Sequence, residues 1–161
     1  MKKMGLFLLT LFVVFLFACG QGGDSPTQGE GGSDSVTNSA WSFETKTTQD
    51  EKELLVQMTV TNQQESQSTL DFASGQLYEM VLTDPNGEEV YRFSEGRMFS
   101  MAIMQEAFEA GESKTFEEVI ALDKLDKGTY TLDVQLVVMA VDNEEWMDEE
   151  TFQNRLDIII D

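Results

Sequence analysis

Carboxylates are the main side chains with which this chain could do chemistry. Its 161 residues include 30 Asp and Glu, 10 Lys and Arg, one Cys and no His. His is the commonest general base and a frequent zinc ligand, so sites that depend on it are excluded. No pair of acids has a spacing that indicates acid–base catalysis. The sequence therefore predicts a protein that is not an enzyme and needs no cofactor.

The acids are densest between residues 142 and 150, where six of nine positions are Asp or Glu. Calcium prefers clustered carboxylate oxygens, but the spacing here matches no EF-hand loop. We therefore interpret the segment as a solvated acidic loop and predict no metal site. A weak candidate cation site remains at four of its acids, namely Asp142, Glu144, Glu145 and Asp148.

Cys19 is the one residue whose surroundings predict a modification. Lys2 and Lys3 precede the apolar run Met4–Phe17, which is too short for a comfortable membrane span and is typical of a signal peptide. The run ends in Leu-Phe-Ala-Cys, the pattern of a lipobox, whose thiol accepts a diacylglyceryl group. A buried structural Cys is the alternative. We predict a signal peptide over residues 1–18, a lipidated Cys19, and anchoring on the extracytoplasmic face of the cell membrane.

Residues 19–39 are rich in Gly, Ser, Asp and Thr, and Val36 is their only large apolar residue. Such a segment buries too little surface to offset the entropy of ordering, so we predict a flexible tether. The remaining residues 40–161 suit one domain with a single core. Loss of Lys2 and Lys3 with the signal peptide would change the net charge from −20 to −22. This charge disfavours nucleic acid as a partner.

Short runs in which apolar and polar residues alternate predict strands throughout the domain. The clearest hairpin lies at residues 76–93, where Asp84-Pro85-Asn86-Gly87 supplies a turn between two apolar runs. About seven strands with regular turns between them predict an all-β, antiparallel sandwich. The strands are expected around Trp41–Phe43, Leu54–Val60, Leu70–Phe72, Gln76–Thr83, Glu88–Phe93, Phe116–Leu122, Tyr130–Val141 and Phe152–Ile160.

The segment Met98–Phe108 is ambiguous. Met98, Met101 and Met104 are spaced by three, whereas Phe99, Met101 and Ile103 alternate. Turns close on both sides favour an extended segment over a helix.

Several motifs in one order resemble the BsuPI-type intracellular proteinase inhibitor domain between about Leu54 and Val138. They are Phe72-Ala73-Ser74-Gly75-Gln76, Tyr78-Glu79, Asp84–Gly87, Tyr91-Arg92-Phe93, Ser94–Phe99, Ala110-Gly111-Glu112-Ser113 and Gly128–Leu132. The family's usual Pro-Gly-Glu turn is Ala110-Gly111-Glu112 here. The resemblance implies an immunoglobulin-like β-sandwich that inhibits a subtilisin-like serine protease. The export signal departs from the family's intracellular setting, so the expected protease is extracytoplasmic.

Two functions remain open. A substrate-like inhibitor needs an exposed, rigid loop with a large side chain for the protease pocket. Arg97, Met98, Phe99 and Met101 are the candidates, although core packing is the preferred interpretation for each. The alternative is a non-catalytic cell-envelope module that binds another protein, a ligand or a cation without inhibiting a protease.

Overall fold

The computed structural model describes residues 32–38 and 40–160. The predicted signal peptide, Cys19 and most of the predicted tether lie outside these residues. Within the described part, no helix is long and apolar enough to cross a membrane.

Three four-stranded sheets, in which every strand pairing is antiparallel, account for the described fold. The first sheet has the order β1 (Ser33–Thr37), β2 (Trp41–Gln49), β3 (Glu53–Asn62), β8 (Ser113–Ala121). The second has the order β12 (Gln153–Ile160), β9 (Gly128–Leu136), β5 (Tyr78–Thr83), β6 (Glu89–Arg92). The third has the order β11 (Glu144–Glu145), β10 (Val138–Val141), β4 (Ser68–Phe72), β7 (Met104–Phe108). A single 3₁₀ turn, η1 (Glu150–Phe152), precedes β12.

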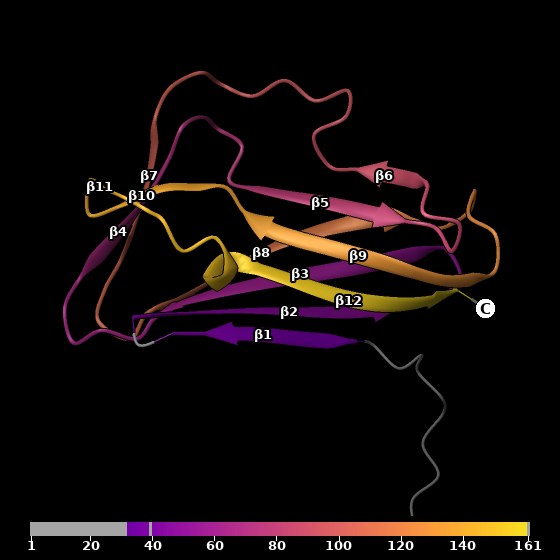
Figure 1. The fold of residues 1–161 in the computed structure, drawn as a ribbon, viewed down its shortest axis with the longest axis horizontal. Helices are drawn as coiled ribbons and strands as arrows, with labels where there is room; N and C mark the ends of the chain where they lie inside the picture. Colours follow the sequence, from indigo (N-terminus) through magenta and orange to yellow (C-terminus); the bar gives the residue numbers. More distant parts are fainter. Residues whose placement is uncertain (1–31, 39, 161) are drawn as a thin grey trace, which may run out of the picture.

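The first two sheets form the layers of a sandwich, and the third lies at one end of it (Figure 1). Alternation in the sequence explains the layers, because every second side chain of a strand points to the same face. In β3, Leu54, Val56, Met58 and Val60 are all buried. They share one continuous core with residues of β9 and β12 in the facing sheet. The predicted all-β, immunoglobulin-like antiparallel sandwich is confirmed.

The predicted hairpin is also confirmed. The amide of Gly87 donates to the carbonyl of Asp84 at 3.0 Å, and Gly87 has a φ of 87°, which glycine adopts without strain. The Asp84 carboxylate accepts hydrogen bonds from the amides of Asn86 and Glu88. These contacts lower the pKa of Asp84, led by the bond from Glu88. The turn thus fixes the register of β5 on β6.

The tether prediction is wrong at its C-terminal end, because Ser33–Thr37 forms β1 and pairs with β2. The folded part therefore begins before residue 40. Asp34 ties β1 to the other layer: its carbonyl accepts the side-chain amide of Asn154, and its carboxylate accepts the amide of Arg155. Polar composition hid this strand because its stability comes from backbone pairing and from these two contacts.

The single strand expected over Tyr130–Val141 is in fact two strands in two sheets. β9 ends at Leu136, the amide of Val137 donates to the carbonyl of Leu77 at 3.0 Å, and β10 continues beside β4. Similarly, only residues 104–108 of the expected extended segment 98–108 form a strand. With β1 and β11 added, the described residues contain twelve strands rather than about seven.

Candidate functional site

The connection between β6 and β7, residues 93–103, is the candidate functional site and is called the 93–103 loop below. It is the long connection that runs across the top of Figure 1. Three apolar side chains project from it into solvent: Met98 is 98% exposed, Met101 91% and Ile103 64%. Core packing is therefore the wrong interpretation for Met98 and Met101. Their exposure makes them candidates for contact with another molecule.

Phe99 and Arg97 attach the loop to the sandwich beneath it. Phe99 is half-buried against the core, and its ring centroid lies 5.9 Å from that of Phe93, which is buried. The guanidinium of Arg97 lies 4.0 Å from the centre of the Phe93 ring and 2.6 Å from the carboxylate of Glu118 on β8. A cation on an aromatic face and a charge pair both favour one position of the chain. Phe99 and Arg97 therefore have positioning contacts within the domain.

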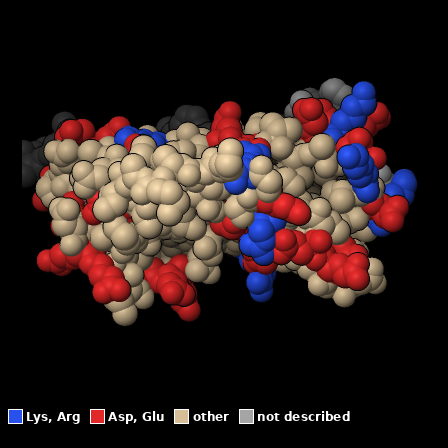
Figure 2. Space-filling model, turned by 90° about the horizontal axis from the view of Figure 1, so that it is seen from above, with Lys and Arg blue, Asp and Glu red and all other residues tan. Residues whose placement is uncertain are grey.

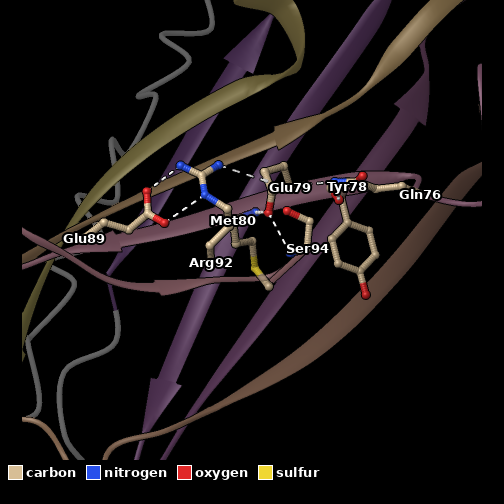
Figure 3. Close-up of polar contacts among 7 residues, drawn as sticks. All are labelled: Gln76, Tyr78, Glu79, Met80, Glu89, Arg92 and Ser94. Atoms are coloured by element: carbon tan, nitrogen blue, oxygen red, sulfur yellow. Dashed lines mark hydrogen bonds and ion pairs between the residues drawn. The ribbon is translucent and has the colours of Figure 1, made fainter. Parts of the chain in front are cut away.

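Glu79 of β5 fixes the start of the loop (Figure 3). One carboxylate oxygen accepts the amides of Met80 at 3.0 Å and Ser94 at 3.1 Å. The other accepts the side-chain amide of Gln76 at 3.1 Å and lies 3.9 Å from the guanidinium of Arg92. Figure 3 also shows Arg92 paired with Glu89 of its own strand. Because one carboxylate holds both β5 and Ser94, the loop leaves the sheet in a defined direction.

A second backbone segment, the β4–β5 connection, supports the far half of the loop. The amide of Gly75 donates to the carbonyl of Ser100 at 2.9 Å. A Cβ at position 75 would lie 2.7 Å from the Ser100 hydroxyl, which is too close for a real contact. Gly75 thus allows the two connections to approach. The exposed Met98 lies between two held points, the Arg97 contacts and Ser100.

Two tyrosines lie in the same polar and aromatic cluster as Arg97. The hydroxyl of Tyr78 donates to Glu118 at 3.4 Å, and its ring contacts Phe93 with centroids 4.4 Å apart. Burial, followed by the negative charge of Glu118, raises the pKa of Tyr78 to about 12. Burial likewise raises the pKa of Tyr91. Both phenols therefore stay neutral at physiological pH, so the cluster contains one cation and one anion in contact.

The face that carries the loop has a broad area without charge. Figure 2 looks onto this face from above, and Asp and Glu gather mainly around the margins of an uncharged region. The chain as a whole carries a net charge of −20. An uncharged area within such a surface is where an approaching acidic surface meets the least electrostatic repulsion.

The acidic segment does not form a cation site in the described residues, where no group of three or more Asp, Glu, Cys or His side chains is arranged to hold a metal. Asp142 has a φ of 53° in the turn between β10 and β11, and its carboxylate accepts the Ser68 hydroxyl and the Thr69 amide. Asp148 accepts the Thr151 hydroxyl, and this bond lowers the pKa of Asp148. Glu144 and Glu145 are exposed in β11. Asp142 and Asp148 thus tie chain segments together.

The fold and this loop define a class of protein, a β-sandwich that presents a supported apolar loop. The family model BsuPI, described as an intracellular proteinase inhibitor, matches residues 41–141, which is more than half of the chain. The chain therefore belongs to the BsuPI family, as the motif order predicted. A family of inhibitors fits a role without catalysis. No curated protein matches the chain.

Solved structures show only distant similarity. β-Glucosidase 3B from Thermotoga neapolitana is 12% identical with a TM-score of 0.42, over 81% of this chain and 16% of that one. The KRT10-binding region domain of the pneumococcal serine-rich repeat protein PsrP is 12% identical with a TM-score of 0.43, over 81% and 96%. A β-glucosidase from Kluyveromyces marxianus is 10% identical with a TM-score of 0.37, over 80% and 14%. With TM-scores below 0.5, these similarities carry no argument.

Sequence reasoning located the loop but missed its supports. Ile103 was not among the candidate contacts, although it alternates with Met101. Glu79, Gly75 and Glu118 are separated from the loop in sequence. Pairing of β5 with β6 brings Glu79 to the loop, Gly75 reaches it through a hydrogen bond to Ser100, and Glu118 belongs to the facing layer. Gly75 and Glu79 belong to the motifs that resemble the family, and Glu79 is also the one charged residue of β5, but neither signal indicated a contact with the loop.

Proposed function

We propose that this protein binds and inhibits a subtilisin-like serine protease through the 93–103 loop. Membership of an inhibitor family supports the general activity. The single observation that carries the site is the near-complete exposure of Met98 and Met101 on a loop held by Arg97, Phe99 and Ser100. A held loop loses little conformational entropy on binding.

The chemistry of the loop matches the proposed target. Subtilisin-like pockets accept large apolar side chains, and a thioether side chain fills an irregular apolar pocket readily. Met98 is the first candidate to enter the pocket, since it is the more exposed and directly follows the held Arg97. Met101 and Ile103 would contact the rim of the protease pocket. Arg97 and Phe99 would act from below, as positioning residues.

We further propose that the protein is a lipoprotein, anchored through Cys19 on the extracytoplasmic face of the cell membrane. The signal-like segment Met4–Phe17 and the lipobox before Cys19 support this address. A Cys19→Ser variant should leave the membrane fraction or accumulate as an uncleaved precursor. Processing and fractionation identical to those of the unmodified protein would contradict the anchor.

Substitution of the exposed methionines tests the inhibitory site. Met98→Asp and Met101→Asp each place a charge where an apolar pocket would close, so inhibition of a subtilisin should weaken by about 30-fold or more, equivalent to roughly 2 kcal/mol. Both side chains are exposed, so the melting temperature should stay nearly unchanged. Inhibition constants and thermal unfolding are measured on the same preparations.

Met147→Asp is the matched control, because Met147 is also a methionine and is 80% exposed, but it lies in the acidic segment. It should leave inhibition unchanged. Equal weakening by all three variants would indicate general charge repulsion and contradict the assignment to the loop. Inhibition that persists in both loop variants would point to another surface, and no inhibition by the unmodified protein would favour the cell-envelope binding module.

A further inference from the structure

We propose that Met98 and Met101 form a reversible oxidation site that switches off the binding loop. This inference rests on the proposed function and adds a means of regulating the same site. It concerns a covalent modification of two side chains, with a hydroperoxide as the oxidant. Three properties decide whether such a switch can work. They are the access of peroxide to each thioether, the polarity of the oxidised side chain, and the effect of that polarity on a loop that docks in an apolar pocket.

Exposure separates the methionines of the described residues into distinct groups. Met98 and Met101 are 98% and 91% exposed, whereas Met58 and Met80 are 0% exposed in the core. Met104 and Met139 are exposed to 38% and 41%, and Met147, outside the loop, to 80%. Oxidation of a thioether requires contact with the oxidant, so its rate follows exposure. Peroxide should therefore reach the docking side chains while the core methionines stay reduced.

The rest of the sequence offers peroxide little competition. The whole chain has one Cys, Cys19, and no His. If the Cys19 sulfur carries a diacylglyceryl group in a thioether bond, as proposed, its thiolate is no longer available to react. Exposed thioethers, chiefly those of Met98, Met101 and Met147, are then the softest nucleophiles that a peroxide meets on the described part of this domain.

The reaction balances without a cofactor. The thioether sulfur donates an electron pair to the distal oxygen of the hydroperoxide, the O–O bond breaks, and an S–O bond forms. The sulfur is oxidised by two electrons to the sulfoxide, and hydrogen peroxide is reduced to water. Methionine sulfoxide reductases reverse the step, with a separate enzyme for each sulfoxide epimer.

Oxidation should change binding without changing the fold. The sulfoxide is a polar, strongly hydrogen-bonding group, which an apolar protease pocket cannot satisfy. Neither Met98 nor Met101 belongs to the core, so its conversion removes no core packing. The contacts that hold the loop come from Arg97, Phe99 and Ser100, none of which is a thioether. The modified loop thus keeps its position and loses its affinity.

Peroxide treatment of the purified full chain, followed by peptide mass spectrometry and titration against a subtilisin, tests the proposal. Sulfoxide should form at Met98 and Met101 at least about ten-fold faster than at Met58 and Met80. Inhibition should weaken by about ten-fold or more, and the melting temperature should stay unchanged. Incubation with both sulfoxide reductases should restore inhibition.

A double variant, Met98→Leu with Met101→Leu, identifies the residues responsible. Leu has a similar volume and cannot be oxidised in this way, so the variant's inhibition constant, whatever its value, should be the same before and after peroxide. Met147 remains in it and still oxidises, which makes it the internal control. Loss of inhibition in the double variant after peroxide would overturn the proposal, as would full inhibition by a chain that carries both loop sulfoxides, or equal oxidation of loop and core methionines.

The untreated chain separates the two proposals. If it inhibits and its oxidised form inhibits equally well, only the switch is overturned. If the untreated chain inhibits no subtilisin, the proposed function fails, and the switch built on it is overturned with it.

Discussion

Two neighbouring side chains beneath the 93–103 loop must differ in charge: Glu118 has to be ionised and Tyr78 has to be neutral. Glu118 must be ionised to pair with Arg97, and the same carboxylate accepts the hydroxyl of Tyr78. The nearby negative charge and burial both disfavour the phenolate, which explains the raised pKa of Tyr78. The three groups form one unit only while Tyr78 keeps its proton.

This unit predicts a loss of stability in alkali. The pKa of Tyr78 rises from its ordinary value of 10 to about 12 on folding. A raised folded-state pKa contributes stability that is complete below pH 10 and is lost as the pH rises through the folded value, because the unfolded chain then releases its proton first. The melting temperature should therefore fall between about pH 10 and pH 12.

Tyr78→Phe provides the comparison. Its ring still packs on Phe93, but it cannot ionise, so its melting temperature should fall less steeply over the same alkaline range. The difference between the two slopes is the measured quantity, because other phenols and lysines titrate there too. Parallel slopes for Tyr78→Phe and the unmodified protein would contradict the role given to this hydroxyl.

At the scale of elements, the β4–β5 connection sets the position of the 93–103 loop. Gly75 does not have the positive φ that is found at Gly87, Gly96 and Gly111. Its lack of a side chain matters because a Cβ at this position would lie 2.7 Å from the Ser100 hydroxyl and 3.3 Å from the Ser100 backbone nitrogen. A Gly75→Ala change therefore acts on the loop through Ser100 and leaves the local backbone unstrained.

Gly75→Ala should shift the loop and weaken inhibition by about five-fold, equivalent to roughly 1 kcal/mol. The melting temperature should change little, since Ala at an unstrained position also reduces the entropy of the unfolded chain. Ser100→Ala removes the clashing oxygen, so the double variant should regain inhibition, and Ser100→Ala alone is the control. Failure of the double variant to recover would show that Gly75 does not position the loop through Ser100.

Regular strands were predictable from the sequence because alternation reports burial directly. β3 and β12 follow this pattern, and their inward-facing residues, such as Leu54 and Leu156, lie in the core, whereas Ile159 faces solvent. β1 was not predictable, because its side chains are mostly polar and the strand is stabilised by backbone pairing with β2. The change from β9 to β10 was hidden because Val137 and Val138 continue an apolar run across the boundary between two sheets.

The candidate site, like the fold, was predictable from the sequence only in part. Motif order indicated the family, and the need of an inhibitor for a large side chain on an exposed loop made Met98 and Met101 candidates. Sequence could not separate a solvent-facing Met98 from a core one, since both are apolar residues next to a turn. The assignment depended on Glu79, Gly75 and Glu118, which reach the loop only through the pairing of β5 with β6, the contact of Gly75 with Ser100, and the packing of β8 in the facing layer.

At the scale of the whole molecule, one acidic sandwich presents one supported apolar loop. A net charge of −20 repels anionic surfaces, and the uncharged region around the loop offers a protein partner the least repulsion. The third sheet and the two layers hold the loop from different sides, through β7 at its end and β5 and β8 beneath it. The fold thus holds the 93–103 loop, with its exposed apolar side chains, through contacts on several sides.

Titration of a purified subtilisin-like protease with the full, reduced chain tests the central claim most directly. The account predicts that residual protease activity falls with added protein and approaches zero at micromolar concentrations or below. It also predicts that the 93–103 loop alone gains protection from hydrogen exchange in the complex. Full protease activity at micromolar protein, or protection confined to another surface, would contradict it.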